Sequence, residues 1–299
     1  MSLTVIGTVA LDSVTSPFGS LEKGLGGSAT HFSASASYFT PVSLVAVIGE
    51  DFPQEHLDFL SARNINLEGV QKLPGKSFHW KGKYEEDLNI AHTLATELNV
   101  LLEFQPQLTP EQKKTPFLFL ANVDPNLQSQ AIDQVEEAPF IAADTMNFWI
   151  EGSRQALLNM LKRIHMLVIN EGEARLLAKE SNLLKASKII RQMGPEILII
   201  KQGEYGALAF YKEEIFSAPG LPLEDIKDPT GAGDSFAGGL MGYLSKTGKK
   251  DFESIKQGII YGSVMASFNV SQFSCEALKN LSETQIKERY ETFRNLARF

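Results

Sequence analysis

The nine residues Asp228–Phe236 constrain this chain more than any other stretch. They read Asp-Pro-Thr-Gly-Ala-Gly-Asp-Ser-Phe, in which Pro229 cannot continue a strand while Gly231 and Gly233 permit a tight turn. From Asp234 onward the apolar residues recur at helical spacing, so we expect a helix to begin there. The backbone N–H groups of such a turn point outward at the positive end of the helix dipole, which favours an anion such as phosphate.

Asp234 follows this turn at a position from which it could take the proton of a hydroxyl that attacks a bound phosphoryl group. The alternative is an ordinary helix N-cap after an ordinary turn. The full nine-residue stretch resembles the C-terminal signature of the ribokinase-like (PfkB) family of carbohydrate and nucleoside kinases. The resemblance implies that Asp234 is the catalytic base and that the amides of Gly231, Ala232 and Gly233 belong to an anion hole.

Composition and charge exclude several classes of protein. The chain has 299 residues, of which 43% are hydrophobic and 21% charged, as is typical of a soluble globular protein. Its net charge of −8 argues against a nucleic-acid surface, which needs a basic field. The single cysteine, Cys275, excludes an internal disulfide and a cysteine-built zinc site. No apolar run approaches the roughly 20 residues that span a bilayer, and no signal sequence precedes the first strand pattern. We therefore expect no membrane partner and a cytoplasmic location.

Strand and helix patterns alternate regularly from Phe117 onward, which predicts a parallel sheet with helices on both faces. Two earlier apolar runs, Leu3–Ala10 and Val42–Ile48, are predicted to be further buried strands. The later predicted strands are Phe117–Ala121, Phe140–Ala143, His165–Ile169, Glu196–Lys201 and Ala207–Tyr211, and the helices include Leu127–Val135, Gly152–Arg163 and Leu183–Met193. The fold class is α/β. The resemblance implies one three-layer α/β/α ribokinase-like domain over residues 1–299, with a mostly parallel central sheet.

The pattern changes from Lys76 to Phe104, where partial alternation predicts an antiparallel pair outside the main sheet. The resemblance implies a β lid over the substrate cleft, contributed mainly by residues 76–104 and by a short piece near 12–20. Because few residues separate Asp12 from Gly26, we expect a reduced lid. Strand edges left exposed in such a lid need a partner or a barrier, so a homodimer that shares lid strands is one option.

Asp12 stands at the end of the first predicted strand, where α/β sheets place ligands, although a turn aspartate explains it equally well. Gly24–Ala29 matches the dinucleotide fingerprint G-x-G-x-x-A, but that motif requires a preceding strand and residues 20–23 do not predict one. We therefore discount hydride transfer. The resemblance implies instead that Asp12 holds sugar hydroxyls and that Gly26 and Gly27 open a helix whose backbone contacts the substrate.

Four side chains bear on the choice of acceptor. Members of the family often carry asparagine where His31 stands, and His31 either contacts one substrate hydroxyl or is a structural histidine. Phe78, Trp80 and Tyr84 lie in the predicted lid. They either stack on the ring of a substrate or pack the lid against the body, and the sequence leaves both interpretations open.

Two polar pairs follow buried strands further along the chain. Asp144 and Asn147 resemble the family's strand-end Asp-x-Asn region, which faces the substrate cleft; turn and cap chemistry is the alternative. Asn170 and Glu173 lie on one face of a helix start. The resemblance implies that this pair organises Mg²⁺, largely through water, and phosphate, and Mg²⁺ suits a site with few carboxylates. For Glu173 the alternative is a first-turn carboxylate favoured by the helix dipole.

The segment from Lys201 to Gly206 resembles the family's Lys-x-Gly-x-x-Gly turn beside the nucleotide. The residues for which the resemblance implies ATP contacts are Lys201, Gly203, Gly206, Thr230 and Asn269, the last of them near adenine. The family often holds a monovalent cation such as K⁺ beside the segment that Asp228 and Thr230 match, where backbone oxygens supply the ligands.

The sequence thus predicts an ATP- and Mg²⁺-dependent transfer of the γ-phosphoryl group to a hydroxyl of a small sugar or sugar-like acceptor. A nucleoside kinase of the same family is the first alternative. A non-catalytic sugar- or nucleotide-binding regulator on this fold is the second, although binding alone would not require Asp234 and Glu173. Which acceptor is used and which hydroxyl is phosphorylated are not predicted.

Overall fold

The computed structural model describes residues 2–296 and 298, and its centre is a nine-stranded sheet. The strand order is β13-β12-β11-β10-β9-β8-β1-β4-β5. The seven strands from β11 to β5 are parallel, whereas β12 and β13 are antiparallel additions at one edge. The bounds are β1 (Leu3–Ile6), β4 (Val42–Ile48), β5 (Ile65–Lys72), β8 (Phe117–Leu120), β9 (Phe140–Ala143), β10 (Met166–Asn170), β11 (Ile197–Lys201), β12 (Ala207–Tyr211) and β13 (Glu214–Ala218).

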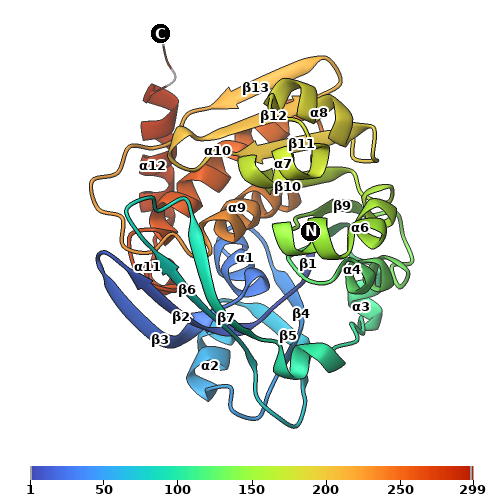
Figure 1. Ribbon diagram of the computed structural model, residues 1–299, viewed down its shortest axis with the longest axis vertical. Helices are drawn as coiled ribbons and strands as arrows, with labels where there is room; N and C mark the ends of the chain where they lie inside the picture. The colour runs from blue at the N-terminus through green and yellow to red at the C-terminus, as the bar shows by residue number, and fades with distance from the viewer. Residues whose placement is uncertain (1, 297, 299) are drawn as a thin grey trace.

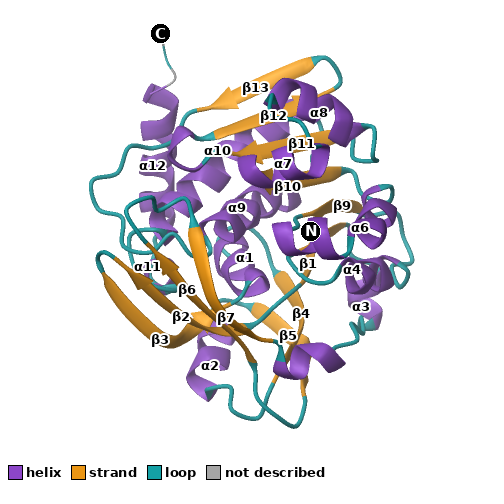
Figure 2. Ribbon diagram, viewed as in Figure 1, coloured by secondary structure: helices purple, strands orange, loops and turns teal. Residues whose placement is uncertain are grey.

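Helices cover both faces of this sheet, as Figures 1 and 2 show, so the predicted three-layer α/β/α architecture is confirmed. One face packs against α1 (Ser28–Ala36), α2 (Gln54–Ala62), α9 (Ala232–Thr247) and α10 (Phe252–Asn269). The other packs against α4 (Pro125–Ile132), α5 (Asn147–Gly152), α6 (Arg154–Leu161), α7 (Glu171–Ala178) and α8 (Leu183–Arg191). The remaining helices are α3 (Pro110–Lys113), α11 (Glu276–Lys279), α12 (Glu283–Leu296) and the 3-10 turns η1 (Asn99–Glu103) and η2 (Gly203–Tyr205).

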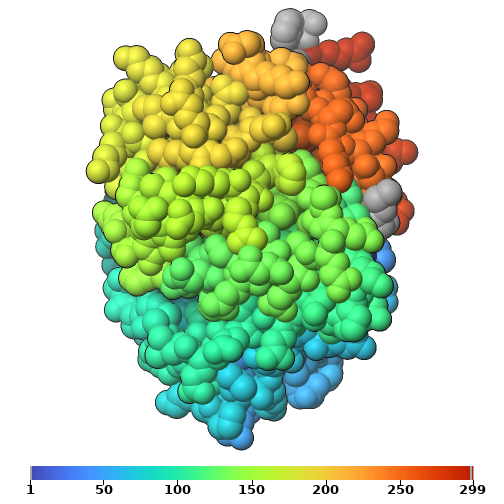
Figure 3. Space-filling model, turned by 90° about the vertical axis from the view of Figure 1, so that its right-hand side faces the viewer, coloured from blue at the N-terminus to red at the C-terminus, as the bar shows by residue number. Residues whose placement is uncertain are grey.

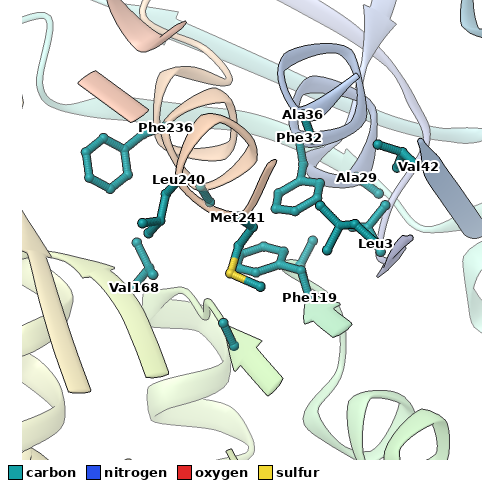
Figure 4. Packing of buried hydrophobic residues seen from close by; sticks show 14 of the residues in the cluster. Leu3, Ala29, Phe32, Ala36, Val42, Phe119, Val168, Phe236, Leu240 and Met241 are labelled. Carbon is teal, nitrogen blue, oxygen red and sulfur yellow. The ribbon is translucent and has the colours of Figure 1, made fainter. Parts of the chain in front are cut away.

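Alternating side chains of the strands supply two separate hydrophobic layers. In β8, Phe117 and Phe119 face α1 and α9, whereas Leu118 and Leu120 face the opposite helices. Figure 4 shows Phe32 of α1 against Phe119, with Met241 of α9 beside them, and the two rings stack with centroids 4.3 Å apart. Every side chain of β8 is buried, so the helices of both layers pack directly against this strand.

A second sheet of four strands forms the lid, and it is larger than predicted. Its order is β3-β2-β6-β7, with bounds β2 (Ala10–Ser16), β3 (Gly19–Gly26), β6 (Phe78–Tyr84) and β7 (Ala91–Glu97). Figure 1 shows these strands, coloured blue and teal, standing beside the main sheet. Residues 10–26 therefore contribute two lid strands rather than a short piece.

Three expectations about the first 26 residues were wrong. The first strand ends at Ile6 rather than Ala10, residues 20–23 belong to strand β3, and Asp12 lies inside lid strand β2 rather than at the end of a main-sheet strand. The chain leaves the main sheet at Gly7, where a Cβ would lie 2.7 Å from the Cβ of Ala121. The strand before Gly24–Ala29 is an antiparallel lid strand, so the context that a dinucleotide site requires is still missing.

Successive strand–helix units of the main sheet lie next to one another. In the side view of Figure 3, the surface runs in bands from cyan through green to yellow, which follows the order of the chain. Helix α5 was not predicted, because six residues are too few to establish a helical period. Within residues 2–296 and 298, no helix is both long and apolar enough to cross a membrane.

Candidate active site

The predicted phosphate-transfer residues meet where the carboxyl ends of three neighbouring strands face the N-terminus of α9. Asp144 follows β9, Asn170 ends β10 and Lys201 ends β11. Asn170 and Lys201 are paired in register, and β9 lies on the other side of β10. Parallel sheets gather their ligand-binding residues at this edge because all strands end there.

The loop at the start of α9, residues 230–233, is called the anion loop below. Gly231 is its N-cap with φ 74°, a left-handed conformation that glycine adopts without strain, and no side chain caps the helix. In the described part of the chain, the N–H groups of Gly231, Gly233 and Asp234 have no hydrogen-bond acceptor. The N–H of Ala232 differs from these, because it donates to the carbonyl of Pro229 at 3.1 Å, and its place in the anion hole stays a prediction. This hydrogen bond closes the turn that begins at Pro229, so the Ala232 N–H points into the turn.

Two carboxyl groups and one ammonium surround the loop. The Nζ of Lys201 lies 2.6 Å from where a Cβ on Gly233 would stand. Asp144, which is 5% exposed, lies near enough to Asp234 for the two carboxyl groups to interact electrostatically. Burial raises the pKa of Asp144 well above its usual range, and the neighbouring Asp234 raises it further, while Lys201 opposes both. Asp144 therefore lies beside the predicted base and the lysine.

Asn170 and Glu173 form a reciprocal helix cap. The Asn170 side chain accepts from the Glu173 N–H at 2.8 Å, and the Glu173 carboxylate accepts from the Asn170 N–H at 2.7 Å. This is the capping-box geometry, which places both side chains at the start of α7. Burial raises the pKa of Glu173, with Lys201 acting against it. Glu173 is therefore a first-turn carboxylate, as the structural alternative stated, and its role in binding Mg²⁺ stays a prediction.

At the acceptor end, Asp12 is held against the start of α1. Its Oδ2 accepts from the Gly27 N–H at 3.2 Å, and its buried Oδ1 has no partner among the described residues. A Cβ on Gly26 would lie 2.0 Å from the Asp12 carboxylate, which explains a glycine at that position. Burial raises the pKa of Asp12 to about 7, although His31 and the Gly27 amide oppose the shift.

His31 is buried between the acceptor helix and the anion loop, with 1% of its surface exposed. Its Nδ1 lies 3.0 Å from Oδ1 of Asn269 and 3.4 Å from the Cys275 sulfur. Burial acts to lower the pKa of His31, but Cys275 and the carboxylates of Asp234 and Asp12 outweigh it and raise that pKa to about 10. Its Nε2 has no partner in the part of the chain that the structure describes.

Asn269 was expected near adenine, and this expectation was wrong. The residue is 0% exposed, and both of its amide atoms bind protein groups. Asn269 is the last residue of α10 and lies beneath the anion loop. The sequence around a helix end does not indicate whether such a residue is buried. Two other predicted residues keep accessible positions: Asn147, predicted on the substrate side, is exposed at the start of α5, and Lys201, predicted on the nucleotide side, is half-buried.

Local structure explains three more of the chosen residues. Gly206 has φ 98°, and a Cβ there would lie 2.1 Å from the carbonyl oxygen of Ala218, so the turn itself requires glycine. Gly203 has φ 58° and lies against Asn89 of the lid. The carboxylate of Asp228 accepts the N–H groups of Thr230 and Ser274, and so braces the segment that precedes the anion loop.

The sequence did not predict that the lid contacts the anion loop. The Tyr84 hydroxyl lies 3.3 Å from Oγ1 of Thr230, and the Ser16 hydroxyl donates to the Lys227 carbonyl at 2.6 Å. Tyr84 is therefore a packing residue and not a free stacking platform. No local signal could have revealed these pairs, because 146 and 211 positions separate their members.

The family assignment rests on the match between this sequence and a family model. The model that describes pfkB family carbohydrate kinases matches residues 3–281. The chain belongs to this family. This kinase is also 30% identical over 266 residues to the cytidine kinase of Thermococcus kodakarensis, which covers 87% of this chain and 94% of that relative. It therefore transfers the γ-phosphoryl group of ATP to a hydroxyl of a sugar or sugar-bearing acceptor.

Solved structures share the fold of this kinase. A putative ribokinase II of E. coli, in complex with ATP and Mg²⁺, superposes with a TM-score of 0.79 at 18% identity and covers 99% of both chains. The nucleoside kinase of Burkholderia thailandensis in complex with inosine gives a TM-score of 0.74 at 17% identity, over 98% of this chain and 99% of that one. The predicted ribokinase-like fold is confirmed.

Proposed function

We propose that the acceptor of this kinase is a nucleoside and that ATP and Mg²⁺ supply the phosphoryl group. The observation that carries the proposal is the pairing of Asp12 with Trp80. These residues are partners in the parallel strands β2 and β6, so their side chains lie on the same face of the lid. Asp12 faces the start of α1, and the Trp80 ring is half-buried and lies across Gly82. A carboxylate beside a flat aromatic ring suits ribose hydroxyls attached to a base.

The cytidine kinase relative adds support to this choice, because it matches the chain nearly from end to end. Asp12 would accept hydrogen bonds from the ribose hydroxyls through the oxygen that has no partner among the described residues. The backbone of Gly26 and Gly27 would lie against the sugar. Trp80 would stack on the base, a contact worth about 1–3 kcal/mol per base in other proteins.

Asp234 would act as the general base of the transfer. It is half-buried in the first turn of α9, next to the free N–H groups of Gly231 and Gly233. It would take the proton of the attacking hydroxyl, and these amides with Lys201 would stabilise the charge of the transferred phosphoryl group. Positioning and electrostatics of this kind supply most of the catalysis in phosphoryl transfer.

The oxygen donors at the site fit Mg²⁺. Glu173 is half-buried, and the buried Oδ1 of Asp144 has no partner among the described residues. Within those residues, no group of three or more His, Cys, Asp or Glu side chains could hold a metal by itself. Mg²⁺ typically binds one or two carboxylates together with substrate phosphates and waters, so this sparse set suits it. The ion would neutralise charge on the phosphates when bound.

Two further parts of the proposal concern a cation and assembly. We place a monovalent cation beside Asp228 and Thr230, held by backbone oxygens, which replacement of K⁺ by choline in the assay buffer would test. A homodimer through the lid would cover the exposed strand β7, whose side chains are nearly all exposed. The molecular mass in solution tests that assembly.

The test is ADP release from MgATP over a panel of nucleosides, free ribose, other sugars and sugar phosphates, with cytidine as the first nucleoside. We expect kcat/KM for at least one nucleoside to exceed that for free ribose tenfold or more. Asp234→Asn should lower kcat about 10²–10⁴-fold. An acceptor-dependent rate that survives Asp234→Asn would contradict the assignment of the base.

A paired substitution tests the acceptor class separately. Trp80→Leu should lower kcat/KM for the nucleoside by about tenfold or more and leave free ribose nearly unchanged, because only the base loses its stacking partner. Lys81→Ala is the matched control, since Lys81 neighbours Trp80 in β6 but points to the opposite face of the lid. A preference for free sugars, or an equal effect of Trp80→Leu on both acceptors, would overturn the nucleoside assignment and leave the kinase intact.

A further inference from the structure

A chain of buried hydrogen bonds beneath the anion loop joins the acceptor helix α1 to the loop itself. The Asn269 Nδ2 donates to the Thr230 carbonyl at 2.7 Å, and its Oδ1 lies 3.0 Å from the Nδ1 of His31. The Ser235 hydroxyl donates to the same Oδ1 at 3.1 Å. His31, Ser235 and Asn269 are each at most 1% exposed. Three segments distant in the sequence therefore meet at one side chain.

The donors and acceptors of this network can be assigned without ambiguity. The Thr230 carbonyl only accepts, so the Asn269 amide must turn its NH₂ group toward the loop and its oxygen toward His31. That oxygen also only accepts, so the Nδ1 of His31 must carry a hydrogen. Because every contact requires this one arrangement, Asn269 has a single orientation in the folded protein.

His31 also supports the loop by direct packing. A Cβ on Gly231 would stand 2.3 Å from both Cγ and Nδ1 of the His31 ring. Thus the ring lies directly against the backbone of the residue at the N-cap of α9. Gly231 is held from below by the imidazole, and the preceding carbonyl of Thr230 is held by Asn269.

We propose that His31 and Asn269 are positioning residues that fix the anion loop in the geometry that receives the transferred phosphoryl group. The inference rests on the proposed role of the Gly231 and Gly233 amides. Donors of an anion hole act only when they lie about 2.7–3.1 Å from the oxygen that develops charge. A misplacement of about 1 Å can cost 10²-fold in rate, so a bond that fixes the Thr230 carbonyl bears directly on catalysis.

If these two residues position the loop, their loss should weaken binding of the transition state much more than binding of the ground-state ligands. Asn269→Leu keeps the volume of the side chain but removes all three of its hydrogen bonds, to Thr230, His31 and Ser235. It should lower kcat at least tenfold and should weaken the binding of MgADP with aluminium fluoride, a mimic of the phosphoryl group in transfer, by a similar factor. The Kd values for MgADP alone and for cytidine should change less than threefold, because neither ligand depends on the exact position of the loop amides.

A second variant and a control distinguish a loss of positioning from a general loss of folding. His31→Phe preserves a ring against Gly231 and removes the bond to Asn269 together with the longer contact to the Cys275 sulfur, so it should give a smaller loss of the same kind. The double variant should lose less than the sum of the two single losses, because both act through the Thr230 carbonyl. Ser33→Ala is the control: Ser33 is fully buried in α1, and its hydroxyl has no partner among the described residues. It should match the wild type.

The outcomes separate this inference from the proposed function. If aluminium fluoride does not tighten MgADP binding in the wild type in the presence of cytidine, the anion hole and the positioning pair both fail. If it tightens binding equally in the wild type and in Asn269→Leu, the anion hole stands and the positioning role is wrong. A parallel loss of MgADP and cytidine binding in both variants would show a general structural role and would also overturn the inference.

Discussion

Gly231 is the residue at which one added methyl group should perturb this protein most sharply. Gly231→Ala would hold an L-residue at φ 74°, a left-handed conformation that costs roughly 1–2 kcal/mol. The new Cβ would also stand 2.3 Å from the His31 ring, which is buried and bonded to Asn269. Overpacking of this kind costs about 1–3 kcal/mol. We therefore expect the free energy of unfolding to fall by about 2–5 kcal/mol.

Thermal unfolding measures this change. For a protein of this size each kcal/mol shifts the Tm by roughly 2 °C, so Gly231→Ala should melt about 4–10 °C below the wild type. Gly233→Ala is the matched control. Its Cβ would meet only the Nζ of Lys201 within 3 Å, and the end of a lysine moves easily. Because alanine also suits a helix better than glycine, the control should be as stable as the wild type or more stable by up to about 1 kcal/mol.

The two variants should differ in stability but both lose activity. Gly231→Ala displaces the loop, and Gly233→Ala displaces the ammonium of Lys201 from the predicted phosphate site. A Tm for Gly231→Ala within 1 °C of the wild type would refute the conclusion that the loop lies against the imidazole. Equal destabilisation by both substitutions would refute the claim that His31 is the cause.

Two further predictions concern pH and magnesium. Burial raises the pKa of Asp12 to about 7, so below that pH the free protein holds Asp12 protonated. Since hydroxyls need the carboxylate as acceptor, acceptor affinity should fall as the pH falls through 7 and be about tenfold weaker at pH 6 than at its plateau, as titration calorimetry would detect. A Kd for the acceptor that is flat from pH 5.5 to 8.5 would contradict this. Glu173→Gln keeps a side chain that can cap α7 but removes its charge, so the Tm should hold while the Mg²⁺ concentration needed for half-maximal rate rises about tenfold. An unchanged Mg²⁺ requirement would remove Glu173 from the metal site.

The strand–helix alternation and the signature loop were predicted because each depends on neighbours in the sequence. Strands from β8 to β12 and the helices between them follow from periods of two and 3.6 residues. The turn at Gly231 follows from proline and glycine chemistry within a few positions. The strands of residues 10–26 were not predicted, because an apolar run does not reveal that the chain changes sheets after Ile6.

The sequence by itself therefore determined the family, the α/β fold and the segment that would bind phosphate. The tertiary structure decided which groups of that segment are free: the Ala232 amide turns inward to Pro229, and the Gly231 amide does not. It also brought His31 to Asn269, across 238 positions of the chain. Such contacts depend on how α1, α9 and α10 pack on one face of the sheet, and packing between distant elements leaves no periodic or local trace in the sequence.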